Sequence, residues 1–206
     1  MPPAGRLTLA SLSLGSLGAG CVDLTDRVPL IEGSGNFCAA DRAATVQSVL
    51  DGDTLCVDGC VGDVDKIRML GVDAPEVAHN STETAEPCGN TAYAFQEEVL
   101  IAREVTLQFD VECTDLYDRT LGWVLLEGDS DDALAGLLAD LDGFGLDEDG
   151  SFSVLANALV VRMGYATVFE GDIAKNIRYA ELMDSAEQAA AAEERGLWSP
   201  EECSGE

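Results

Sequence analysis

The sequence predicts an α+β fold, a five-stranded antiparallel OB-like β-barrel with about three helices. Three observations support this class. Five short segments rich in apolar and β-branched residues lie between residues 44 and 126, and one segment with helical spacing interrupts them. Beyond residue 150 the composition becomes helical. The chain is also 47% apolar, enough to bury a core despite its many acidic residues.

The first three strands are expected before residue 73. Residues 44–56 are rich in Val, Leu and Thr around Asp51-Gly52-Asp53, which is typical of a tight turn between two strands. Residues 66–72 form the third short strand, and a loop containing proline and glycine follows it. The barrel is therefore expected to begin with a hairpin whose tip carries two carboxylates.

One helix and two more strands complete the predicted barrel. Residues 91–103 place apolar side chains such as Phe95 and Val99 at helical spacing. Residues 105–111 and 121–126 have the alternating or continuously apolar pattern of strands. The helix is thus expected between the third and fourth strands.

Two helices are predicted in the second half of the chain. Residues 154–163 are apolar and are followed by Gly164, a residue that often ends a helix. Residues 174–195 are rich in Ala and Glu and are followed by Gly196. We expect both segments to pack on the barrel.

An acidic segment separates the barrel from these helices. Residues 127–150 hold nine acidic residues and no Lys or Arg, and residues 133–141 could form a short helix. Residues 140–150 alternate acids with glycines, as calcium loops do, but they lack the spacing and the closing Glu of a twelve-residue calcium loop. The pattern favours a solvated acidic insertion.

The net charge limits how the protein can bind nucleic acid. The chain has 39 Asp and Glu against 11 Lys and Arg, a formal charge of -28. Non-specific nucleic-acid binding depends on basic side chains that neutralise phosphates, so this charge argues against tight binding of that kind. An acidic, hydrated surface is suited to salty solution, where screening is strong.

The N-terminus is typical of an exported protein. Residues 7–20 form an uncharged run that is too short to span a bilayer but suits the core of a signal peptide. Small residues precede Cys21, so residues 1–21 are either a removed leader or a lipoprotein signal with Cys21 as the lipid anchor. Residues 22–43 have no clear period and are interpreted as a linker.

Cysteine usage agrees with export. The chain has seven cysteines, so an even number remains if Cys21 is removed or lipidated, and these can pair in an oxidising compartment. Cys56 and Cys60 flank an expected hairpin tip and could bridge it. Cys38 and Cys203 could tie the two ends of the domain together. The spacing does not match a zinc site.

Two polar runs supply the residues from which a metal site can be built. Asp53 lies in the run 51–54 and Asp73 in the run 68–76, each at the end of an expected strand. Carboxylate oxygens are the ligands that Ca²⁺ prefers, and a cation would relieve the repulsion between two carboxylates brought together. The pattern therefore indicates a calcium site.

The same runs, with residues 115–119, supply groups for phosphate chemistry. Arg68 and Arg119 are two of few basic residues, and a planar guanidinium matches the oxygens of a phosphoryl group. Glu76 follows Asp73 after a proline and could take a proton from an attacking water. Together these residues indicate phosphodiester hydrolysis.

The order of these runs identifies a family resemblance. Residues 51–54 (DGDT), 68–76 (RMLGVDAPE) and 115–119 (DLYDR) resemble the patterns DGDT, R-L-x-G-[IV]-D-[AT]-P-E and D-x-Y-G-R of the staphylococcal nuclease-like (thermonuclease) family. The resemblance extends to further short runs, which are residues 87–92, 157–160, 164–166 and 196–198. It implies a nuclease-like domain over residues 44–199, with the acidic insertion 127–150 and a C-terminal tail, 200–206.

The resemblance implies a role for each matching residue. Asp53 and Asp73 would ligate Ca²⁺ together with the backbone carbonyl of Ala74. Asp51 would support these ligands without binding the metal itself. The remaining roles concern the nucleic acid, either DNA or RNA. Glu76 would activate the attacking water, Arg68 and Arg119 would bind and stabilise the phosphate, and Tyr117 would contact the phosphate or sugar.

Two departures from the family pattern bear on substrate binding. Asp118 stands where the family has Gly, and its carboxylate could pair with Arg119 or force a different turn. Residues 167–171 lack the tyrosines that stack on the base in the best-known member of the family. We expect an exported, monomeric, calcium-dependent nuclease acting on short or single-stranded nucleic acid. The alternative is a catalytically weak, nuclease-like binding module on the cell envelope.

Overall fold

The computed structural model of the chain describes residues 37–61, 65–78, 82, 84–173, 176, 178–199 and 201. The expected export segment 1–21, with Cys21, lies outside these residues, as do most of the linker and Cys203. Within the described part of the chain, no helix is both long enough and apolar enough to cross a membrane.

The predicted OB-like barrel is confirmed. Six strands follow one another in the order β3-β2-β1-β5-β6-β7, and β3 also pairs with β6, which closes a five-stranded barrel. Their bounds are β1 Arg42–Asp51, β2 Thr54–Val57, β3 Lys66–Met69, β5 Glu104–Gln108, β6 Thr120–Asp129 and β7 Ser151–Leu155. The closing pair is parallel, so the barrel is mixed rather than purely antiparallel.

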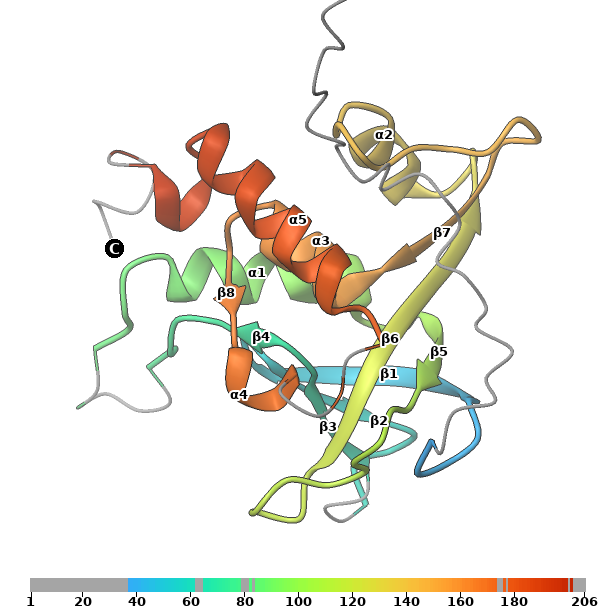
Figure 1. Ribbon diagram of the computed structural model, residues 1–206, viewed down its shortest axis with the longest axis vertical. Helices are drawn as coiled ribbons and strands as arrows, with labels where there is room; N and C mark the ends of the chain where they lie inside the picture. The colour runs from blue at the N-terminus through green and yellow to red at the C-terminus, as the bar shows by residue number, and fades with distance from the viewer. Residues whose placement is uncertain are drawn as a thin grey trace, which may run out of the picture.

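Two long strands allow the sheet to close. β6 pairs at its start with β3, further along with β5 and at its end with β7, so one continuous strand crosses the whole molecule (Figure 1). β1 has register shifts between Val46 and Ser48 and between Val49 and Asp51 where it pairs with β2. Such irregularities bend a strand, and the bend lets β1 contribute to both sides of the barrel.

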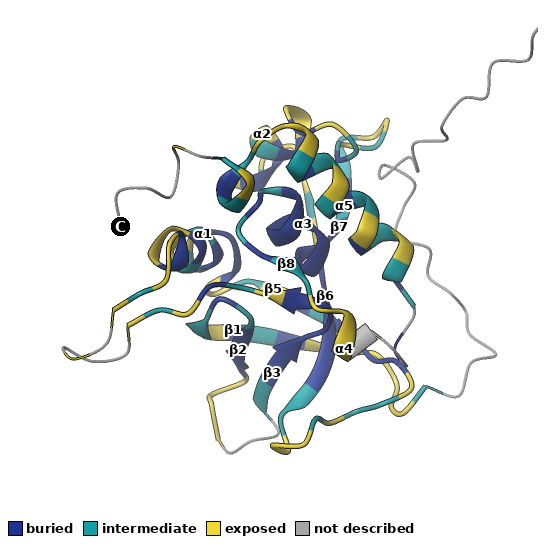
Figure 2. Ribbon diagram, turned by 60° about the vertical axis from the view of Figure 1, so that its left-hand side comes forward, coloured by how far each residue is buried: buried dark blue, intermediate teal, exposed yellow. Residues whose placement is uncertain are grey.

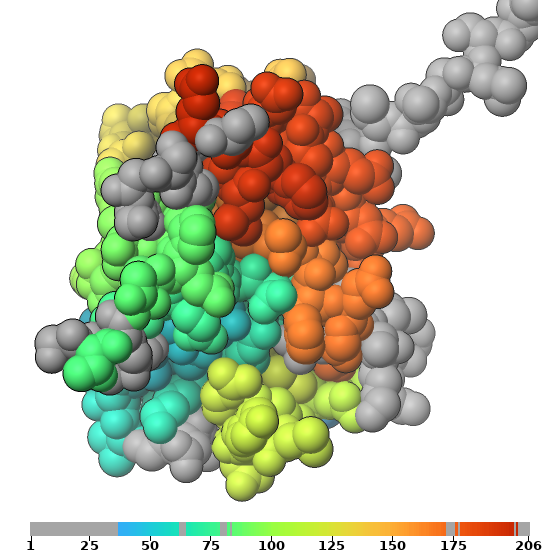
Figure 3. Space-filling model, turned by 90° about the vertical axis from the view of Figure 1, so that its left-hand side faces the viewer, coloured from blue at the N-terminus to red at the C-terminus, as the bar shows by residue number. Residues whose placement is uncertain are grey.

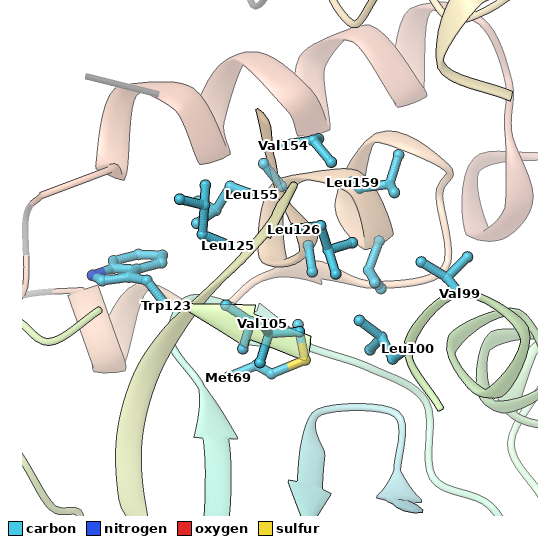
Figure 4. Packing of buried hydrophobic residues seen from close by; sticks show 14 of the residues in the cluster. Met69, Val99, Leu100, Val105, Trp123, Leu125, Leu126, Val154, Leu155 and Leu159 are labelled. Atoms are coloured by element: carbon cyan, nitrogen blue, oxygen red, sulfur yellow. The ribbon is translucent and has the colours of Figure 1, made fainter. Parts of the chain in front are cut away.

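The helices gather at one end of the barrel. Their bounds are α1 Gly89–Leu100, α2 Ala133–Ala139, α3 Ala156–Arg162, α4 Glu170–Ile173, α5 Ala180–Ala192 and the 3₁₀ helix η2 Gly196–Trp198. α3 is buried along its whole length and lies between α5 and the sheet (Figure 2). Val99 of α1 and Leu159 of α3 meet side chains of the strands in the core (Figure 4).

One predicted helix was wrong in part. Residues 154–163 were expected to be helical throughout, but β7 occupies residues 151–155 and α3 begins only at Ala156. Residues 151–155 alternate half-buried and buried positions, and each pairs with β6. The strand forms because the free edge of β6 supplies hydrogen-bond partners, and a neighbour distant in sequence is invisible to a local pattern.

The cysteines pair partly as expected. Cys56 and Cys60 form a disulfide, as predicted. Cys38 is bonded to Cys113, so the predicted Cys38–Cys203 bridge was wrong. Cys88 is also disulfide-bonded. The N-terminal end of the domain is therefore tied to the segment between β5 and β6.

Candidate active site

The turn between β1 and β2 is held against the segment after β4 (Val72–Asp73). A Cβ atom built on Gly52 would lie 2.4 Å from the Cβ of Ala74, so only glycine allows this approach. Asp51 accepts a hydrogen bond from the backbone N–H of Asp53 at 3.2 Å. The backbone of this turn therefore lies directly against Ala74.

Arg68 is buried beside this turn. It is 5% exposed, and its Nη1 lies 2.8 Å from Oδ2 of Asp53 and donates to the carbonyl of Val72 at 2.6 Å. Burial raises the pKa of Asp53 to about 7, and the neighbouring Asp51 adds to this rise while Arg68 opposes it. Asp53 is therefore a desolvated carboxylate whose charged form is favoured by the adjacent Arg68.

Arg119 reaches the same place from the hairpin that leads into β6. Its Nη1 donates to Oγ1 of Thr54 at 3.3 Å, and Thr54 in turn donates to Oδ1 of Asp53 at 2.8 Å. The Thr54 hydroxyl thus links Arg119 to Asp53, the carboxylate that Arg68 binds. A continuous polar chain therefore runs from Arg68 of β3 through Asp53 and Thr54 to Arg119, the residue before β6.

The carboxylate that binds Arg119 is Asp115. Nε of Arg119 donates to Oδ2 of Asp115 at 2.7 Å, and the backbone N–H donates to Oδ1 at 2.9 Å. Burial alone would raise the pKa of Asp115, but the hydrogen bonds from Arg119 and from the Tyr117 amide hold it below its ordinary value. Asp118 lies at φ 62°, the left-handed region that glycine favours, so it keeps the turn a Gly would make.

The two arginines lie on the wall of one pocket of about 540 Å³. Its lining residues are Arg68, Glu112, Thr114, Asp115, Leu116, Tyr117, Arg119, Leu121, Phe169 and Gly171. Figure 3 shows the hairpin before β6, in yellow-green, on the same face as the orange segment around β8 (Thr167–Val168). The pocket is therefore built by two segments that are far apart in sequence.

Asp73 and Glu76 are not among the residues that line this pocket. Asp73 is exposed and pairs with Thr167 through β4 and β8. The Glu76 side chain is exposed, and its backbone carbonyl accepts from Glu86 at 2.9 Å. A Cβ on Gly89, the first residue of α1, would lie 2.5 Å from that carbonyl, so the backbone of Glu76 is packed against the start of the helix.

The donors present suit a hard cation with few protein ligands. The part of the chain that is described contains no group of three or more His, Cys, Asp or Glu side chains that could hold a metal ion. The Asp51–Asp53 turn carries two carboxylates and its backbone lies against Ala74, with Asp53 desolvated. Ca²⁺ accepts such oxygens and completes its shell with water.

Sequence reasoning missed three pocket residues. Asp115 was treated only as part of a motif, yet it fixes Arg119. Phe169 places an aromatic ring on the pocket wall, where the Arg68 guanidinium lies 5.7 Å from the ring centre, so the segment 167–171 is not without an aromatic group. Glu112 adds a carboxylate. An exposed aromatic residue in a polar segment was the signal available for Phe169.

The fold agrees with the comparisons to known proteins. The model of the family described as staphylococcal nuclease homologue matches residues 66–200, and the chain belongs to that family. A thermonuclease of Staphylococcus intermedius is 38% identical over 81 residues, 39% of this chain and 47% of the relative. A thermonuclease of Staphylococcus hyicus is 38% identical over 88 residues, 43% of this chain and 51% of the relative.

A longer alignment reaches a different protein. Endonuclease YhcR of Bacillus subtilis (strain 168) is 26% identical over 159 residues, 75% of this chain but 11% of that protein. The chain spans about half the length of the two thermonucleases that it matches. The family is therefore established, and the activity of the whole protein is a matter for proposal.

Proposed function

We propose that this chain is an exported, calcium-dependent nuclease that hydrolyses phosphodiester bonds of DNA or RNA. The observation that carries the proposal is the pocket whose wall holds both Arg68 and Arg119, joined through Thr54 to the Asp53 carboxylate. Two guanidinium groups can share the negative charge of one phosphate, and this charge grows as the phosphorus is attacked.

The residues of the chain would have the following roles in the reaction. Water forms a bond to phosphorus, Glu76 takes the proton of that water, and the bond to the 5′ oxygen breaks. The leaving oxygen takes a proton from solvent. Arg68 and Arg119 stabilise the phosphate throughout, and Tyr117, which is 78% exposed at the pocket, contacts the phosphate or the sugar.

Calcium would be held by Asp53, Asp73 and the carbonyl of Ala74, with Asp51 supporting Asp53. When bound, the cation would neutralise developing charge and help to orient the phosphate. The burial of Asp53 and its raised pKa support this assignment, because a desolvated carboxylate gains most from a cation.

The substrate would be single-stranded or short nucleic acid. The pocket offers two arginines and the rings of Tyr117 and Phe169, whereas the chain carries a formal charge of -28. Binding through ring contacts is possible only for unpaired bases. We expect a monomer that is released or anchored through a lipid on Cys21.

A second candidate function is that of a nuclease-like binding module with little turnover. It is favoured by one observation: each arginine is already held by a carboxylate, Arg68 by Asp53 and Arg119 by Asp115. A phosphate would have to compete with these partners.

Hydrolysis of a single-stranded oligonucleotide distinguishes the two functions. The protein is incubated with substrate in Ca²⁺ and then in chelator, across a series of salt concentrations. We expect cleavage only with Ca²⁺. Glu76→Gln should lower kcat by roughly 10²–10⁴-fold without unfolding the protein, because it removes the general base.

The matched control is Glu148→Gln, which makes the same charge change at an exposed position of the acidic insertion. It should keep full activity. The nuclease proposal is wrong if no salt concentration gives Ca²⁺-dependent cleavage. Oligonucleotide binding without cleavage would instead favour the binding module.

A further inference from the structure

The hairpin that precedes β6 supplies most of the pocket wall. Six of the ten lining residues lie within residues 113–121: Thr114, Asp115, Leu116, Tyr117, Arg119 and Leu121. One limb of this hairpin, Thr120 and Leu121, belongs to β6 and pairs with β3. The other limb, from Cys113 to Asp115, lies outside the named strands.

The outer limb is tied to the barrel at its base, where Glu112 donates its backbone N–H to Oδ1 of Asn176 at 2.9 Å and Cys113 packs against the core. Within the hairpin, Leu121 donates to the Cys113 carbonyl at 2.8 Å and Asp115 donates to the Arg119 carbonyl at 3.1 Å. Outside it, the covalent link is the Cys38–Cys113 disulfide, with 5.5 Å between Cα atoms. Cys113 stands directly between two residues of the pocket wall, Glu112 and Thr114.

The other end of this disulfide is well anchored. Cys38 donates its backbone N–H to the carbonyl of Asp110 at 2.7 Å and lies four residues before β1. β1 pairs with both β2 and β5, so it is a central strand of the barrel. The disulfide thus joins the outer limb of the substrate hairpin, residues 113–121, to the segment that leads into β1.

We propose that the Cys38–Cys113 disulfide is a positioning element for the substrate hairpin, and that a thiol reductant weakens substrate binding by cleaving it. This proposal rests on the proposed nuclease function. In the reduction, the S–S bond breaks, Cys38 and Cys113 each gain a hydrogen, and a dithiol is oxidised to its own disulfide. Cys38 is exposed and Cys113 half-buried, so a small dithiol can reach the bond.

Once the disulfide is reduced, the hairpin would have to be ordered again when substrate binds. The cost of this ordering weakens binding. Tyr117 lies at its tip, whereas Arg119 is additionally held by Thr54, and Asp53 and Glu76 lie on other segments. The effect should therefore fall on KM more than on kcat. We expect the Kd for a single-stranded oligonucleotide to rise about tenfold.

The test measures binding and hairpin order separately. Kd is measured by fluorescence anisotropy with a labelled single-stranded oligonucleotide in chelator, for the oxidised protein, the dithiol-reduced protein, Cys38→Ser and Cys113→Ser. Hydrogen exchange is followed at the amides of Asp115 and Leu121. All measurements are made at a temperature well below the thermal unfolding midpoint of each form. KM and kcat are then measured in Ca²⁺.

The matched control is Cys60→Ser, which opens the Cys56–Cys60 disulfide at the far end of β2 and leaves Cys56 as a buried thiol. We expect weaker binding and faster exchange in Cys38→Ser, Cys113→Ser and the reduced protein, and neither change in Cys60→Ser. Unchanged Kd in Cys38→Ser, with only a lower unfolding midpoint, overturns the proposal, since the bond would then serve stability alone.

An equal weakening of oligonucleotide binding in Cys60→Ser also overturns the proposal. The oxidised protein could neither bind nor cleave the oligonucleotide while Cys38→Ser still speeds exchange at Asp115. In that case the nuclease function is wrong, but the disulfide does order the hairpin.

Discussion

Gly52 lets the Asp51–Thr54 turn lie directly on Ala74. A side chain there would collide with the Ala74 Cβ at 2.4 Å, and both atoms belong to short, rigid groups that cannot swing away. The turn would have to move, and with it the carboxylate of Asp53. The close approach therefore couples backbone packing to the geometry of the proposed calcium site.

Gly52→Ala should consequently lower the free energy of unfolding by about 1–3 kcal/mol, as overpacking does, and weaken Ca²⁺-dependent cleavage. Thermal unfolding and kinetics measure the two effects. The control is Gly136→Ala in α2, where an added Cβ meets nothing within 4 Å and should stabilise the helix by roughly 0.5–1 kcal/mol. Full activity in Gly52→Ala would contradict the proposed metal site.

Asp118 holds a left-handed conformation at φ 62°, next to Arg119. Asp118→Gly should raise the free energy of unfolding by up to about 1 kcal/mol, because glycine adopts this region without steric cost. Activity should stay within about twofold, since Asp115 is the carboxylate that fixes Arg119. A large gain of activity would instead show that the Asp118 carboxylate hinders phosphate binding.

The site was predictable from sequence only in its chemistry. Arg68, Arg119 and Tyr117 line one pocket, and their roles toward a phosphate remain predictions. The partners that hold them, such as the Thr54 hydroxyl between Arg119 and Asp53, depend on which strands meet. Glu76 and the calcium ligands remain predictions.

At the scale of single elements, α2 shows how the acidic insertion is attached to the barrel. Asp132 caps the helix by accepting the N–H of Leu134 at 2.8 Å, and it also binds both terminal nitrogens of Arg103. The hydrogen bond with Arg103 is the largest cause that holds the pKa of Asp132 below its ordinary value.

Asp132→Ala should lower the free energy of unfolding by about 1–2 kcal/mol through loss of the cap and the ion pair. Asp132→Asn can still cap the helix and should lower the free energy of unfolding by less. Because the folded-state pKa of Asp132 is lowered, its charge stabilises the protein above the ordinary value of 3.8, and this contribution is lost as pH falls. The difference between wild type and Asp132→Asn should therefore shrink below about pH 4 in urea titrations. A constant difference down to acidic pH would contradict the ion pair.

Local pattern predicted most elements but not their boundaries. The helix at residues 89–100 follows from its apolar spacing, and the hairpin around residue 52 from its turn residues. The strand β7 was missed because its apolar residues fit a helix equally well until β6 supplied a partner.

For the whole molecule, the two described disulfides should contribute unequally to stability. Cys38 and Cys113 are 75 residues apart in sequence, whereas Cys56 and Cys60 are 4 apart. Loop-closure entropy then gives about 4 kcal/mol for the first and about 2 kcal/mol for the second. Denaturant unfolding of Cys38→Ser and Cys60→Ser measures the difference, and equal losses would show that loop length does not set it.

The charge of -28 should make stability depend on salt. Screening of the acidic surface relieves repulsion within the folded protein, so Tm should rise as NaCl is increased toward about 1 M. Each 1 kcal/mol of relief corresponds to about 2–4 °C for a chain of this size. A Tm that stays constant or falls across the series would contradict this expectation.

Local periodicity, motif chemistry and composition were enough to predict the fold class and the acidic character of the chain, and they singled out the arginines and the tyrosine that line the pocket. Only the tertiary structure decided that β3 and β6 close the barrel in parallel, that Phe169 joins the pocket and that Cys38 bonds Cys113. Each of these depends on contacts between segments more than fifty residues apart. Such contacts are set by packing of the whole chain, which no local pattern encodes.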